Sequence, residues 1–176
     1  MLNWRRIITE DLIPALAANE YWRNSISEIL ADDLSPSGLH LAVFVEPYLQ
    51  YILEGKKTVD SRFGMRRTTP YGRVVPGDVM LLKRSSGPVI GLCRISQVWF
   101  YKLDPSSWKN LKSNFAQALC AQDPKFWEKR SEAAYVTLMR LTSVLPIPPV
   151  PFPKQDRRGW VILRGNANLK DGDIAN

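Results

Sequence analysis

Residues 55–62 constrain the fold of this chain most, because a short helix ends there at a glycine and a charged strand follows at once. The apolar residues before the junction recur at helical spacing, as Tyr48, Leu49, Ile52 and Leu53. Gly55 then stands where helices commonly end, since glycine adopts the left-handed conformation without strain. Beyond it, Thr58, Asp60 and Arg62 alternate with their neighbours, as on one face of a strand. On spacing alone, this charged strand could equally be a solvated edge.

The same patterns divide the rest of the chain into elements. A helical segment is predicted over 3–33, with a bend at Pro14 and a linker over 34–38. Strands are predicted over 39–45, 58–63, 79–83, 89–99, 135–145 and 160–163. Helices are predicted over 46–54, 108–121 and 123–130. The proline-rich run 146–153 must be extended, because proline fixes φ and removes a hydrogen-bond donor.

Five or six short strands, with helices inserted at only two places, predict an α+β fold built on a small β-barrel. A doubly wound sheet would need strands that alternate regularly with helices, and this chain does not alternate. Its 176 residues suit one domain. The predicted organisation is a helical extension over 1–38, the barrel domain over 39–164 and a polar, poorly ordered tail over 165–176.

Two motifs in a fixed order give this chain a family resemblance. The first is Gly55-Lys56-Lys57-Thr58-Val59-Asp60-Ser61-Arg62 after a helix, and the second is Val75-Pro76-Gly77-Asp78 before an apolar strand. Together with the strand 89–95 and the closing segment 157–163, they resemble the ASCH domain of the PUA-like superfamily over roughly residues 39–164. The resemblance implies a PUA-like barrel that binds RNA or modified nucleotides, and a few members of the family are hydrolases.

The resemblance also gives Lys57 a possible catalytic role. Lys57 matches the lysine that ASCH amidohydrolases acting on acetylated cytidine use as a catalytic base. Those enzymes carry a threonine where this chain has Asp60, and a glutamate on a later helix, whereas residues 108–121 contain no Glu or Asp. We therefore expect no strong activity of this kind. A carboxylate beside Lys57 is also expected to keep the lysine protonated, a form that binds phosphate or carbonyl groups but is not a base.

Positive charge gathers in the same part of the chain. The net charge is +7, and residues 54–112 hold 12 basic and 4 acidic residues, whereas residues 1–53 hold 3 and 7. A localised basic surface attracts polyanions, although such a surface can also serve solubility alone. Within this segment Lys83, Arg84 and Ser85 lead into a Ser/Gly turn whose amides and cations could hold a phosphate. An ordinary hairpin turn is the alternative.

Aromatic residues are numerous, with six tryptophans and six tyrosines. Most are expected in the core, but Tyr71 and one tryptophan beside the basic residues could stack on a base. The predicted ligand-binding residues are therefore Lys57, Thr58, Asp60, Arg62, Tyr71, Lys83, Arg84 and Ser85. RNA or a nucleotide-like molecule is the expected partner.

Other chemistries find little support in the sequence. His40 is the only histidine, which excludes a two-histidine ribonuclease mechanism, and its apolar strand predicts a structural role. Cys93 and Cys120 lie far apart and lack zinc spacing, so reduced thiols are expected, with a disulfide as the alternative. We expect no metal or cofactor, no membrane span and no signal peptide, hence a cytoplasmic protein.

Two other functions remain alternatives to binding. One is a hydrolase of the same fold acting on RNA or a modified nucleoside, with Lys57 and Asp60 as catalytic residues. The other is an accessory module that binds proteins through the N-terminal helices and the proline run, and those helices could also support oligomers.

Overall fold

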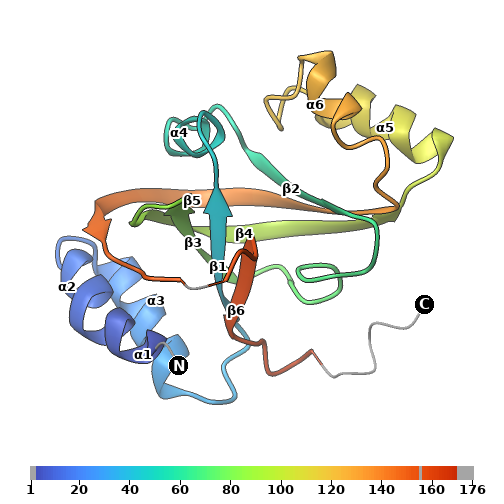
Figure 1. The fold of residues 1–176 in the computed structure, drawn as a ribbon. Coiled ribbons are helices and arrows are strands. Elements are labelled where there is room, and N and C mark those ends of the chain that lie inside the picture. Colours follow the sequence, from blue (N-terminus) through green and yellow to red (C-terminus); the bar gives the residue numbers. More distant parts are fainter. Residues whose placement is uncertain (1–2, 155, 170–176) are drawn as a thin grey trace.

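A single six-stranded sheet organises the computed structural model, which describes residues 3–154 and 156–169. The strands are β1 (Leu39–Phe44), β2 (Val59–Gly64), β3 (Val79–Arg84), β4 (Val89–Lys102), β5 (Tyr135–Val150) and β6 (Trp160–Arg164). Their order is β2-β5-β4-β3-β1-β6; β1 and β3 are parallel, and every other neighbouring pair is antiparallel. The sheet curls into a half-barrel with helices around it, which confirms the predicted α+β barrel class (Figure 1).

The helix–glycine–strand junction forms as predicted. Helix α4 (Tyr48–Leu53) is followed by Gly55 at φ +72°, and the amides of Lys56 and Lys57 both donate to the carbonyl of Tyr51. These hydrogen bonds satisfy the end of the helix and fix where β2 begins. Lys57 is thereby placed at the base of β2, just after the helix.

Two further helices lie on the same side of the sheet as α4 and above β2 in Figure 1. Helix α5 (Pro105–Phe115) begins and ends earlier than the predicted 108–121. Asp104 and Ser107 form a capping box and Pro105 fills the first turn, so the start of α5 lies before Trp108. Helix α6 (Pro124–Glu128) is a short helix capped by Asp123.

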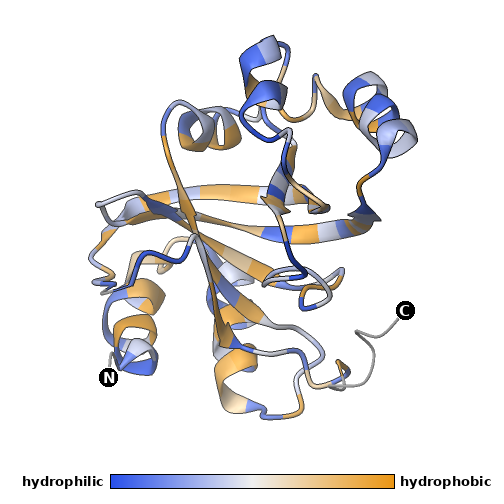
Figure 2. Ribbon diagram, turned by 45° about the vertical axis from the view of Figure 1, so that its right-hand side comes forward, coloured by the Kyte–Doolittle hydropathy of each residue, from blue (hydrophilic) through white to orange (hydrophobic). Residues whose placement is uncertain are grey.

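The N-terminal helices pack against the sheet of the same chain. They are α1 (Trp4–Ile7), a π-helical turn η1 (Ile8–Leu12), α2 (Ile13–Ala15) and α3 (Glu20–Ala31). The predicted helix over 3–33 passes through Pro14 and ends after Ala15. A π-turn, in which the Ile13 amide donates to the Ile8 carbonyl, accommodates the proline. Apolar residues line the N-terminal helices as well as the long strands (Figure 2), and the buried ones among them form one core cluster.

Arg94 of β4 joins this helical layer to the barrel. Its guanidinium donates to Tyr21 Oη at 2.8 Å, to Ser25 Oγ at 3.1 Å and to the carbonyl of Gly77 at 2.8 Å. The extension is therefore a packed part of the core, with its apolar face already covered by the sheet. None of the helices described is long and apolar enough to cross a membrane.

The first half of the proline run belongs to the sheet. Strand β5 continues past the predicted end at residue 145, and Pro146 and Val150 pair with Gly91 and Val89 of β4. Strand β2 pairs only with residues 135–140 of β5, so the later part of β5 is an edge, where missing N–H donors are tolerated. The remaining segment up to 154 has no regular structure.

Candidate functional site

The opening between the two edges of the curled sheet is bridged by one side chain. Strands β2 and β6 lie at opposite ends of the strand order. The Nη1 atom of Arg62, on β2, donates to the carbonyls of Val43 on β1 and Gly159 just before β6, each at 3.1 Å. In the described part of the chain β2 does not pair with β1 or β6, and the Arg62 side chain supplies the hydrogen bonds between these two sides of the half-barrel.

Arg62 also belongs to a compact cluster of charges. Its Nε donates to Asp60 Oδ2 at 2.7 Å, and Lys57 Nζ lies 3.9 Å from Asp60 Oδ1. Lys57 Nζ in addition donates to the carbonyl of Leu119 at 3.2 Å. Lys57 and Asp60 are buried, and Arg62 is partly exposed. The structure thus brings together three of the residues singled out in the sequence.

Burial changes the acid–base character of Lys57. Loss of hydration lowers the pKa of Lys57 below its ordinary value, and the nearby Asp60 carboxylate offsets this effect only in part. Burial, and not the Asp60 carboxylate as we expected, is the larger influence on the pKa of Lys57, whereas the expected protonated form of Lys57 stays a prediction. The reason is that the sequence shows the carboxylate but not the burial. Lys57 therefore loses its proton at a lower pH than an exposed lysine.

Two connected hollows surround the cluster. The larger, which we call the cleft, has a volume of about 640 Å³ and lies between β2, the turn after α6, the loop around Pro70 and the start of β6. The smaller, which we call the inner pocket, has a volume of about 110 Å³ and is lined by Lys57 and Asp60. Ser61, Arg62 and Arg130 line both, so the inner pocket opens beside the cleft.

Aromatic rings hold the two arginines of the cleft in place. The guanidinium of Arg130 lies 3.7 Å from the ring centre of Phe126, and its Nη1 donates to the Phe126 carbonyl at 2.7 Å. Arg62 lies over Phe44 at 4.6 Å and Trp160 at 5.4 Å. Cation–π contacts of this kind favour an ordered guanidinium. Lys129 also lines the cleft and is exposed.

One donor of Arg62 is left over. Among the described residues, Arg62 Nη2 and Thr137 Oγ1 are the buried side-chain polar atoms without a hydrogen-bond partner. These two residues pair directly across β2 and β5. Buried polar atoms are rarely left unpaired, so these two atoms are an exception among the described residues.

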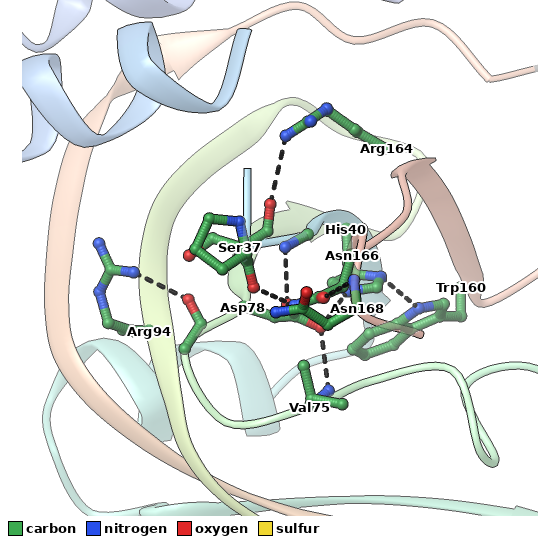
Figure 3. Close-up of polar contacts among 12 residues, drawn as sticks. Ser37, His40, Val75, Asp78, Arg94, Trp160, Arg164, Asn166 and Asn168 are labelled. Carbon is green, nitrogen blue, oxygen red and sulfur yellow. Dashed lines mark hydrogen bonds and ion pairs between the residues drawn. The ribbon is translucent and has the colours of Figure 1, made fainter. Parts of the chain in front are cut away.

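Asp78 forms the support behind the cleft (Figure 3). This fully buried carboxylate accepts from Gly38 N at 2.6 Å, His40 Nε2 at 2.9 Å, Val75 N at 3.0 Å and Asn166 Nδ2 at 3.3 Å. Trp160 Nε1 donates to His40 Nδ1 at 3.3 Å, so the imidazole proton sits on Nε2. His40 therefore has a structural position, and the network orients the indole that packs on Arg62.

The hairpin residues lie away from the cleft. Lys83 Nζ donates to the carbonyls of Arg84 and Gly87 and lines a separate groove beside residues 149–154. Arg84 pairs with Glu46 at 3.2 Å, and the Ser85 amide donates to Phe44. Successive strand residues point to opposite faces, so Lys83 and Arg84 do not converge. Their assignment to a ligand stays a prediction.

Thr58 and Tyr71 also have other surroundings. Thr58 is exposed, and its amide donates to the carbonyl of Ala118 at 3.0 Å. Tyr71 packs against Phe100 and Tyr135, with ring centres 5.1 and 5.4 Å away, and carries the Arg67 guanidinium over its face. It lines a hollow of about 20 Å³ beneath Arg62 rather than the cleft.

Sequence reasoning missed Arg130, Lys129 and Trp160 as cleft residues. Arg130 follows a short helix 68 positions after Arg62, and only the packing of α6 over β2 brings the two together. No local pattern distinguishes Arg130 from other surface arginines. Both cysteines are free, and Cys93 is buried in β4, where burial raises its thiol pKa. No group of three or more metal-binding side chains occurs within residues 3–154 and 156–169.

Comparison with solved structures identifies the fold. The chain is similar to the crystal structure of ASCH from Zymomonas mobilis, with a TM-score of 0.59 and 16% identity over 76% of this chain and 90% of that one. It is also similar to the ASCH domain from Lactobacillus crispatus JV V101, with a TM-score of 0.50 and 13% identity over 80% and 95%. No family model and no curated protein matches the sequence. The likeness confirms the ASCH-domain fold that the motifs predicted.

Proposed function

We propose that this ASCH-fold chain binds RNA or a nucleotide-like ligand in the cleft between β2, α6 and β6. The observation that carries the proposal is the convergence of Arg62, Arg130 and Lys129 on one hollow of about 640 Å³. Two acidic residues, Asp60 and Glu132, line the inner pocket and the cleft respectively. Asp60 is already paired with Arg62, so positive charge at the cleft exceeds what the protein itself neutralises.

The chemistry of the lining fits a nucleotide. Guanidinium groups bind phosphate oxygens and base carbonyls through several parallel donors, and both Arg62 and Arg130 line the cleft. Phe63, which is partly exposed, adds an apolar surface to the lining of the cleft. The basic balance of residues 54–112 adds long-range attraction for a polyanion.

Salt-sensitive binding of a hexauridylate tests this proposal. We expect affinity to fall between 50 and 200 mM KCl with a log–log slope of about −2, because each neutralised phosphate of a single strand contributes roughly 0.7. Fluorescence anisotropy of the labelled RNA would measure it. Lys129→Glu should reduce both the affinity and the slope. Arg23 is exposed on α3, away from the cleft, so Arg23→Glu is the matched charge reversal and should change neither. A slope near zero would contradict an electrostatic cleft.

A hydrolase acting on RNA or a modified nucleoside is a second candidate. The observation that favours it is the buried Lys57, whose pKa is lowered and whose Nζ lies 3.9 Å from Asp60 in the inner pocket. A lysine whose pKa is lowered gives up its proton more readily than an exposed one, and in the neutral form it can accept a proton from a substrate or from water. Helix α5 carries neither Glu nor Asp, so it supplies no match for the helix glutamate of the acetylcytidine amidohydrolases.

Lys57→Met separates catalysis from binding. If the chain is a hydrolase, product formation from the hexauridylate should be abolished in this variant while binding at the cleft changes much less. The rate of the unchanged protein should rise with pH as Lys57 deprotonates, and the rise should lie below the ordinary lysine range because burial lowers the pKa. Chromatography of the reaction products across pH 6–10 would measure both. Turnover that survives Lys57→Met would exclude Lys57 as the base.

A further inference from the structure

A second groove lies on the other side of α6. It has a volume of about 590 Å³ and runs between α5 and the turn that follows α6. Trp108 and Trp127 line it, with ring centres 6.2 Å apart and planes at 83°. The exposed Lys112, one turn after Trp108 on α5, lies 6.0 Å from the Trp127 ring. We call this hollow the tryptophan groove.

The tryptophan groove adjoins the cleft. The segment after α6 forms the wall between them, because Glu128 and Ser131 line the groove whereas Lys129, Arg130 and Glu132 line the cleft. One aromatic pair also spans the wall: Phe63 lines the cleft, Trp108 lines the groove, and their rings stack at 5.7 Å with an interplanar angle of 9°. A chain that leaves the cleft over this short wall would enter the groove.

We propose that the tryptophan groove is a second base-stacking site, for a neighbouring nucleotide of a single-stranded RNA whose first nucleotide occupies the cleft. The inference rests on the proposed binding of RNA in the cleft. It assigns to the chain an extended ligand of several nucleotides rather than a lone nucleotide.

The lining favours such an occupant. Trp108 is half-buried and lines the groove, so part of its ring is accessible there. A ring beside an ammonium group provides stacking for a base and attraction for its phosphate, and this combination tolerates any sequence. Glu128 would repel a phosphate, so the RNA backbone should pass on the Lys112 side.

The experiment compares uridine monophosphate with the hexauridylate on the full chain. We expect the hexauridylate to bind about 10-fold or more tightly, because stacking a second base adds affinity. Trp108→Ala and Lys112→Glu should each remove most of this advantage while leaving the affinity for uridine monophosphate within about twofold. Lys112 is exposed, so Lys112→Glu tests the groove even if Trp108→Ala weakens the fold, and Arg23→Glu is the matched charge control.

The outcomes separate the two proposals. If both ligands bind with equal affinity, or if the groove variants leave hexauridylate binding unchanged, the groove is not a second site although the cleft still binds a nucleotide. If neither ligand binds the unchanged protein, the proposed function of the cleft fails, and the inference fails with it. Circular dichroism would confirm that each variant is folded.

Discussion

Replacing Asp78 with alanine is expected to lower the free energy of unfolding by about 3–5 kcal/mol, because several buried donors lose their shared acceptor at once. The carboxylate is fully buried and accepts hydrogen bonds from Gly38, His40, Val75 and Asn166. Its loss would leave buried donors without partners, and each such donor costs about 1–3 kcal/mol in a non-additive manner. Urea unfolding followed by circular dichroism would measure the difference.

Two companion variants separate the cause of this loss. Asp78→Asn keeps the volume but replaces one acceptor by a donor that faces other donors, so it should destabilise nearly as much as alanine. Asp33→Ala removes an exposed carboxylate that lies 3.8 Å from Arg5, and it should leave the unfolding midpoint within experimental error. A loss below about 1 kcal/mol for both Asp78 variants would show that the network does not hold the fold.

Arg62→Lys is expected to weaken hexauridylate binding by about 10- to 100-fold, the equivalent of one or two charge-assisted hydrogen bonds. Lysine keeps the positive charge beside Asp60 but cannot reach Asp60, Val43, Gly159 and a ligand together, because it lacks the planar fork of donors. Lysine is preferred to alanine here, since alanine would leave the buried Asp60 unpaired and could unfold the barrel.

Anisotropy titration with the hexauridylate would measure the affinity, with Arg23→Lys as the control for the same substitution on α3. Binding that is unchanged in Arg62→Lys would mean that the ligand does not use the guanidinium, and the cleft would lose its main recognition group. If Arg62→Lys also loses its cooperative unfolding transition, the main role of Arg62 is instead to hold the half-barrel closed.

Local patterns predicted the parts of the fold that depend on neighbours in sequence. The α4–Gly55–β2 junction follows from helical spacing and a left-handed glycine, and both are visible in eight residues. The turn before β3 was similarly visible in Pro76-Gly77-Asp78. Pairing between distant strands was not visible. Strand β5 extends to Val150 only because β4 supplies a partner for residues that contain prolines.

The sequence predicted the charged residues of β2 and its junction with α4, but it missed the cleft residues that come from other elements. Asp60 and Arg62 are two residues apart, so strand geometry predicts them on one face, whereas the direction of Lys57, which precedes β2, was left open by the sequence. Arg130 and Trp160 reach the cleft through packing between elements far apart in the chain. The burial that lowers the pKa of Lys57 is likewise a tertiary property, which is why the sequence did not reveal the direction of this shift.

A crystal structure of the chain with uridine monophosphate bound would test directly whether the cleft is the binding site. We expect the nucleotide in the cleft, with a base or phosphate oxygen about 3 Å from the Arg62 guanidinium and Arg130 on the other side. The Asp78–His40–Trp160 network should be unchanged in that complex. A nucleotide held in the groove of Lys83 and Lys154, with an empty cleft, would show that the cleft is not the binding site.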